Sequence, residues 1–103
     1  MTIQAWLDGR EPAPPPALAA RVRELASAVR TPGDDHASTC LAAAEARLAS
    51  LVRQGEAGRV GALDLLAIDA LVTYAFEAAA ATPGSVPERA AEAMSRLSLV
   101  AAP

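Results

Sequence analysis

The segment DDHASTC, residues 34–40, holds the chain's single histidine and single cysteine. His36 and Cys40 are four residues apart, a spacing that puts both side chains on one face of a helix. Imidazole and thiolate are good zinc ligands, and the neighbouring carboxylates of Asp34 and Asp35 could add oxygen ligands. The paired CxxC or HExxH motifs typical of zinc sites are absent from the sequence. We therefore predict no metal or cofactor, and keep His36 and Cys40 as metal ligands only for a site that a second copy completes.

Arg30 and His36 form an R-x5-H motif, in which Thr31 follows the arginine and Pro32-Gly33 interrupts the spacing. The motif resembles the R-x4-6-H signature of HEPN-type RNases. That resemblance implies a small all-α dimer in which the arginine and histidine of both subunits line a shared cleft and act on RNA. The alternative is structural: Arg30 would lie at the C-terminal end of one helix, where a cation is favourable, and His36 near the start of the next.

Two groups of acidic residues lie at helical spacing. Asp69, Thr73 and Glu77 share one stripe, and Glu88 and Glu92 are four residues apart. A di-iron bundle needs two Glu-x-x-His motifs, which a single histidine cannot supply. The chain also lacks lysine, so a P-loop lysine and a Schiff-base lysine are excluded. We expect the first stripe to be the solvent edge of its helix or to pair with arginines, and we predict no enzymatic activity.

Apolar periodicity and turn residues divide the chain into helices. Pro16–Arg30 carries Leu18, Val22, Leu25 and Val29 on one face. Proline fixes φ, so the EPAPPP run is a stiff connector between this helix and a short N-terminal helical arm. We predict an all-α fold: an arm and Pro-rich connector over residues 1–16, and an up-down four-helix bundle over residues 17–103. The expected helices cover residues 2–8, 16–30, 35–54, 61–81 and 85–101.

Capping signals fix the expected register of the last two helices. With Gly61 as N-cap, Asp64 would be the third helical residue, where a carboxylate meets free backbone N–H groups. Ser85 and Glu88 have the spacing of a capping box. The expected buried face of the last helix comprises Val86, Ala90, Met94, Leu97 and Ala101.

Composition limits the location and the partners. The chain has 103 residues, 52% of them hydrophobic and only 3% aromatic, so its core should be aliphatic. A net charge of −3 argues against a nucleic-acid partner, which requires a basic surface. A single cysteine fits a reducing compartment, and the N-terminus lacks the pattern of a signal peptide. These observations predict a cytoplasmic protein.

The most apolar segment, Ala62–Ala81, decides the functional prediction. Asp64, Asp69 and Glu77 interrupt it, so it is a poor membrane span. Its hydrophobic residues occupy most of the helix circumference, and such a helix must be covered on most sides. We predict a non-enzymatic protein that acts by association, either as a homodimer or larger homo-oligomer or as an accessory subunit of another protein. The expected interface residues are Trp6, Leu7, Leu65, Ile68, Val72 and Phe76.

Two alternatives remain open at this point. The Trp6 arm could instead fold back onto the bundle and complete a monomer. The protein could also be a HEPN-like RNase that uses Arg30 and His36, in which case replacing either residue would abolish RNA cleavage.

Overall fold

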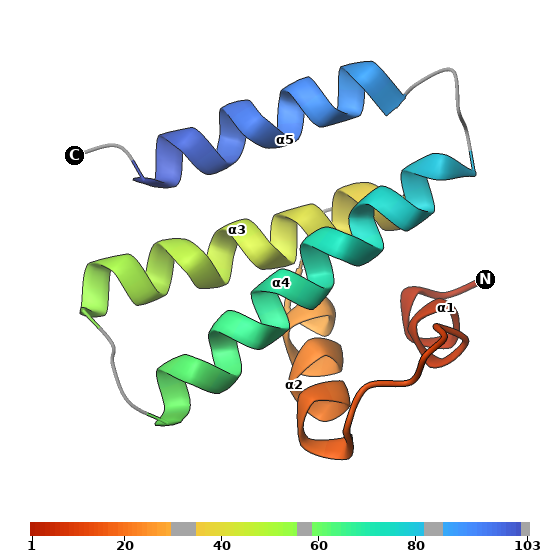
Figure 1. Cartoon of the computed structure of the whole chain (residues 1–103), viewed down its shortest axis with the longest axis horizontal. Helices are drawn as coiled ribbons and strands as arrows, with labels where there is room; N and C mark the ends of the chain where they lie inside the picture. The colour runs from red at the N-terminus through yellow and green to blue at the C-terminus, as the bar shows by residue number, and fades with distance from the viewer. Residues whose placement is uncertain (30–34, 56–58, 82–85, 102–103) are drawn as a thin grey trace.

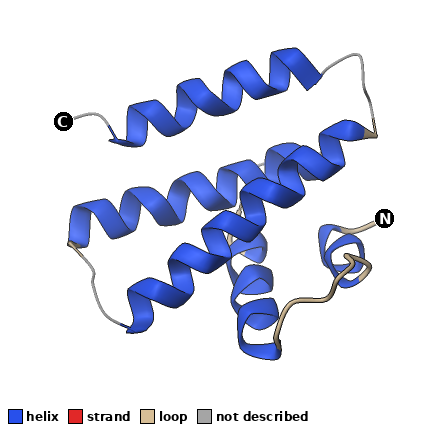
Figure 2. Cartoon of the chain, viewed as in Figure 1, coloured by secondary structure: helices blue, strands red, loops and turns tan. Residues whose placement is uncertain are grey.

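The structure is a computed structural model that describes residues 1–29, 35–55, 59–81 and 86–101. Within these ranges every regular element is an α-helix (Figure 2), as predicted. The helices are α1 (Ile3–Asp8), α2 (Pro16–Ser27), α3 (His36–Gln54), α4 (Arg59–Ala80) and α5 (Val86–Ala101).

The bundle is built around the pair α3 and α4, which share the most extensive helix–helix contact. Figure 1 shows α3, α4 and α5 running in alternate directions, with α5 along α3 and α2 crossing the central pair. The short α1 lies beside α2 and also reaches α3. The all-α bundle expected from the sequence is therefore present. Its first long helix, α2, crosses the central pair α3 and α4.

Local signals set the ends of α3. The side chain of Asp35 accepts a hydrogen bond from the backbone N–H of Ala37 at 3.0 Å, which caps the N-terminus. Gly55 ends the helix in the left-handed conformation, with φ of 62°. These ends agree with the helix expected over residues 35–54.

The start of α4 differs from the prediction. The helix begins at Arg59, so Gly61 lies inside it and Asp64 is the sixth helical residue, not the third. Gly61 is buried, and packing offsets the intrinsic cost of a glycine inside a helix. Asp64 consequently cannot cap the helix and must find its partners on other helices.

The core lies where α3 faces α4. Its fully buried apolar residues are small or aliphatic, so the two helices can approach closely. Leu71 is the largest side chain with no exposed surface. Around it lie Val22, Ala26, Cys40, Leu41, Ala43, Ala44, Leu51, Ala67, Ile68, Ala75 and Ala93.

α5 is rotated relative to the prediction. Ala93 is its buried residue, whereas Met94, expected on the buried face, is 67% exposed. Ala90 and Leu97 of the expected face are half-buried, so the observed face is turned by less than the about 100° that separates consecutive residues on a helix. An ion pair between Arg96 and Glu45 of α3 holds this rotation. The side chains of Val86 and Ala101, and Ser85 of the predicted capping box, lie outside the description.

Candidate functional site

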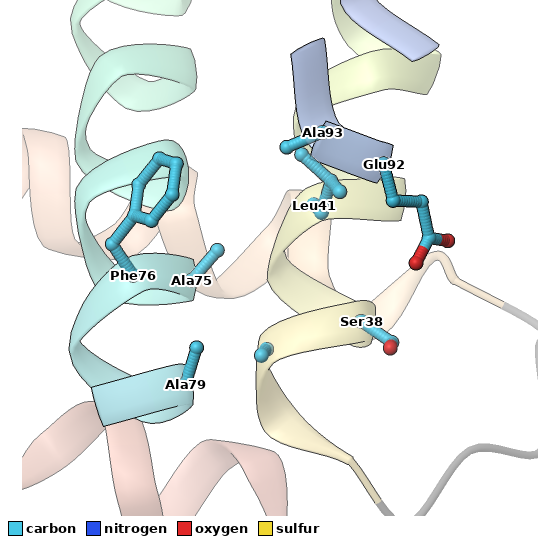
Figure 3. Close-up of a pocket in the computed structure, with 8 residues that line it drawn as sticks. Ser38, Leu41, Ala75, Phe76, Ala79, Glu92 and Ala93 are labelled. Carbon is cyan, nitrogen blue, oxygen red and sulfur yellow. The ribbon is translucent and has the colours of Figure 1, made fainter. Parts of the chain in front are cut away.

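An apolar stripe runs along α4 on the side that faces α5. Leu65 is 54% exposed and Phe76 is 41% exposed, while Val72 between them is half-buried. These three positions fall within about 40° of one another around the helix. Figure 3 shows Phe76 with Ala75 and Ala79 of α4, opposite residues of α3 and α5. Phe76, at one end of the stripe, therefore lines an opening between α4, α3 and α5.

α3 and α5 extend this apolar stripe. On α5, Met94 is the residue after Ala93, which lines the same pocket as Phe76. Arg96 and its partner Glu45 occupy the opposite edge of the α5 contact, so Met94 projects from the edge nearer α4. On α3, Val52 is 58% exposed and lies about 20° around the helix from Leu41, another residue of that pocket. We define the apolar surface as Val52, Leu65, Val72, Phe76 and Met94.

The predicted interface residues divide into two groups. Leu65, Val72 and Phe76 are part of the apolar surface. Leu7 and Ile68 are instead buried in the core of the single chain, so they offer a partner little contact area. The sequence places Ile68 on the same side of the helix as Leu65, Val72 and Phe76. It does not show how far α3 reaches around α4, and it therefore predicts Ile68 as an interface residue.

Trp6 is engaged within the chain. Its ring stacks on His36 with centroids 5.4 Å apart and meets Tyr74 edge-on at 6.3 Å. The guanidinium carbon of Arg10 lies 4.0 Å from the centroid of Trp6, in cation–π geometry. Arg10 also pairs with Glu77 of α4 at 3.5 Å. The N-terminal arm therefore folds back onto the bundle, the alternative that the sequence left open, and covers the Tyr74 side of α4.

The two candidate metal ligands have different surroundings. His36 stacks on Trp6, while Cys40 has no exposed surface. Burial raises the pKa of the Cys40 thiol to about 12, so the thiolate that metals require is disfavoured. In the part of the chain that the structure describes, no three His, Cys, Asp or Glu side chains come together as a metal site.

Of the two residues that resemble the RNase motif, the structure describes only one. Arg30 lies outside the described ranges, and His36 is half-buried beneath Trp6. The RNase alternative thus stays a prediction.

The acidic stripe of α4 lies on the solvent side. Asp69, Thr73 and Glu77 are all exposed, as expected for a wet edge, and Glu77 also meets Arg10. Glu88 and Glu92 are exposed on α5, and Glu92 lies within 3.7 Å of Arg96.

The most notable polar site is a buried carboxylate that the sequence analysis assigned to a helix cap. Asp64 is 1% exposed. Arg21 of α2 donates from Nε to Oδ1 at 2.6 Å and from Nη2 to Oδ2 at 3.2 Å. Arg47 of α3 donates from Nε to Oδ2 at 2.5 Å. The hydrogen bond from Arg21, followed by that from Arg47, lowers the pKa of Asp64. One ionised carboxylate thus ties α2, α3 and α4 together.

A signal for this site is present in the sequence. Asp64 projects from the side of α4 opposite Ala62 and the acidic stripe, among residues that must be buried. A carboxylate on a buried face needs a cationic partner. Two arginines donate three hydrogen bonds to its oxygens, so the site is suited to holding helices together.

Comparisons with models of known protein families, with curated proteins and with solved structures found no match for this chain. Among the described helices, none is both long enough and apolar enough to cross a membrane.

Proposed function

We propose that this protein works by binding another protein chain through the apolar surface, as a homo-oligomer or as an accessory subunit, and carries out no catalysis itself. The observation that carries the proposal is the outer side of α4. This helix forms the centre of the core, yet Leu65 and Phe76 remain exposed, as do Val52 of α3 and Met94 of α5. Exposed large apolar side chains gathered on neighbouring helices are typical of interaction sites.

The shape of this region fits a protein partner better than a small ligand. Small-molecule sites are concave and enclose most of the ligand. The apolar surface instead spans three helices, and all its residues except the half-buried Val72 are exposed along them. Alanines and Leu41 fill the space between α3, α4 and α5 next to Phe76 (Figure 3). A partner would therefore lie across the surface, with Phe76 and Met94 as its largest contacts.

A cytoplasmic location is part of the same proposal. It is supported by Cys40, a buried free thiol that is the chain's single cysteine, because free thiols persist in reducing compartments.

Site-specific photo-crosslinking in cells tests the proposal. Benzoylphenylalanine at position 65 places the reactive group in the apolar surface, and the matched control carries it at Ala20, an exposed residue of α2. We expect a discrete protein adduct from position 65 and none from position 20. Equal labelling at both positions, or no adduct at position 65, would refute the proposal.

A further inference from the structure

A cavity of about 180 Å³ lies where the N-terminal arm meets the bundle. Among its described lining residues, five belong to the arm and the connector, Leu7 and Arg10 among them. The others belong to α2 and α4, Val22 and Tyr74 among them. Protein interiors contain few voids larger than a water molecule, so a space of this size between packed elements is a candidate binding site.

The volume of the cavity sets the size of its ligand. A cavity of about 150 Å³ lined by aliphatic and aromatic side chains is large enough to hold benzene. The cavity beneath the arm therefore admits one ring, or one branched alkyl group, with a small substituent. Leu7 and Val22, which are both buried, and Ala19 supply apolar contacts for such a body.

The charged residues of the lining leave one cation for the ligand. Asp8 and Arg23 neutralise each other through an ion pair at 2.6 Å. Arg10 is half-buried, and its guanidinium carbon lies 4.0 Å from the centroid of the Trp6 ring. Within the described ranges, Arg10 donates one hydrogen bond, from Nε to the carbonyl oxygen of Trp6 at 3.2 Å. Both of its Nη groups are thus able to donate to an anion.

Glu77 would compete with that anion for Arg10. Its Oε2 lies 3.5 Å from Nη1 of Arg10, which is longer than an ordinary hydrogen bond. A ligand carboxylate can instead form the two parallel hydrogen bonds that a guanidinium favours. Tyr74 lines the same cavity, and its hydroxyl makes no hydrogen bond to any residue that the structure describes, so it can donate a further one.

We propose that this cavity binds a small aromatic or branched aliphatic carboxylate, with the carboxylate on Arg10 and the apolar body between Leu7 and Val22. The ligand ties the arm to the bundle, because it contacts residues of both. Tyr74 lies about 180° around α4 from Leu65, so the cavity is separate from the apolar surface and goes beyond the proposed function.

An NMR titration of the isotope-labelled full chain with benzoate tests the proposal. We expect saturable shifts of the backbone amides of Leu7, Ala19 and Val22, with a dissociation constant on the order of 1 mM for a ligand of this size. Benzylammonium has the same ring and the opposite charge, and it should bind at least about tenfold more weakly.

Two matched pairs of variants locate the site. Arg10→Gln and Glu77→Gln both break the ion pair between the arm and α4, but only the first removes the partner of the carboxylate. Arg10→Gln should weaken benzoate binding at least about tenfold, whereas Glu77→Gln should leave it as tight or tighten it. Ala19→Leu fills the cavity from α2 and should abolish the shifts, and Ala20→Leu at the neighbouring exposed position should leave them unchanged. The amide spectrum of each variant shows that it is folded.

Three results would overturn the proposal. Equal binding of benzoate and benzylammonium would show an apolar void with no preference for anions. Equal losses from Arg10→Gln and Glu77→Gln would show that their ion pair only keeps the arm in place. An unchanged wild-type spectrum at high millimolar benzoate would show that the cavity binds no such ligand, and would leave the proposed function, which concerns the opposite side of α4, unaffected.

Discussion

Replacing Asp64 by asparagine should destabilise the fold far more than removing an ordinary surface charge. Asparagine keeps the shape of the side chain but removes the charge that faces Arg21 and Arg47. Arg21 and Arg47 then share a neutral partner that accepts on one oxygen only. A matched control is Asp8→Asn, because Asp8 pairs with Arg23 at the same 2.6 Å that separates Asp64 from Arg21, but is 53% exposed.

The magnitude follows from burial. Removing one member of a fully buried ion pair costs about 3–5 kcal/mol, because the remaining charge loses its partner. Here the arginine side chains are 26% and 19% exposed, so water partly compensates them, and Arg21 keeps Glu24 at 2.9 Å. We therefore expect a loss of about 2 kcal/mol for Asp64→Asn, or a melting temperature lower by about 8–16 °C. Asp8→Asn should cost at most about 1 kcal/mol.

The pH dependence gives a second test of the same reasoning. The pKa of Asp64 is lowered in the folded state, so its charge stabilises the protein above the pKa of an unfolded aspartate, about 3.9. That stabilisation is lost as the pH falls through the lowered pKa. We measure the free energy of unfolding by urea titration followed by circular dichroism. The difference in this free energy between wild type and Asp64→Asn should be constant near neutral pH and should become smaller below pH ~4. A difference that persists in strong acid, or a control as costly as Asp64→Asn, would refute this account.

Three further results are expected. Leu71→Ala should lower the unfolding free energy by about 2–5 kcal/mol, because it removes a buried side chain. Leu66→Ala, at a 57% exposed position of the same helix, should change the unfolding free energy by less than about 0.5 kcal/mol. Similar losses for the two variants in urea titrations would contradict the assignment of Leu71 to the core. The Cys40 thiol of the folded protein should react slowly with an aromatic disulfide reagent at mildly alkaline pH, because burial raises its pKa to about 12. In urea, where the chain is unfolded and the thiol is exposed, the reaction should be fast. A fast reaction of the folded protein would show that Cys40 is not buried. Gly55→Ala should cost about 1 kcal/mol, because its φ of 62° strains a residue with a Cβ; an unchanged melting temperature would show that the turn relaxes.

The helices could be predicted from the sequence because their signals are local. A seam of apolar residues spaced three and four apart needs only neighbouring residues to be recognised. Asp35 and Gly55, which bound α3, act on backbone groups within a few positions of themselves. The start of α4 differs from the prediction because Gly61, expected as the N-cap, is a buried residue inside the helix, and local signals do not show which residues the packing of the bundle buries.

The partners of Asp64 show where local reasoning ends. Arg21 is 43 residues away in sequence and Arg47 is 17 residues away. The sequence could indicate that a carboxylate on a buried face needs a cation, but the chain offers nine arginines and spacing does not choose among them. The rotation of α5 is a similar case, because the contact between Arg96 and Glu45 that holds it joins two helices.

The exposed side of α4 follows from how its neighbours divide the circumference. α2 and α3 cover the side that holds Asp64 and Leu71, and the α1 arm covers the Tyr74 side through Trp6. α5 packs mainly on α3, and among its described side chains Ala93 is the one that is buried, so it leaves the Leu65 side open. The sequence could show that α4 has more apolar surface than one small bundle covers. Which side stays open depends on where α1 and α5 pack. Their positions leave the Leu65 side exposed, and for that reason the proposed function places the partner there and not on the Trp6 arm.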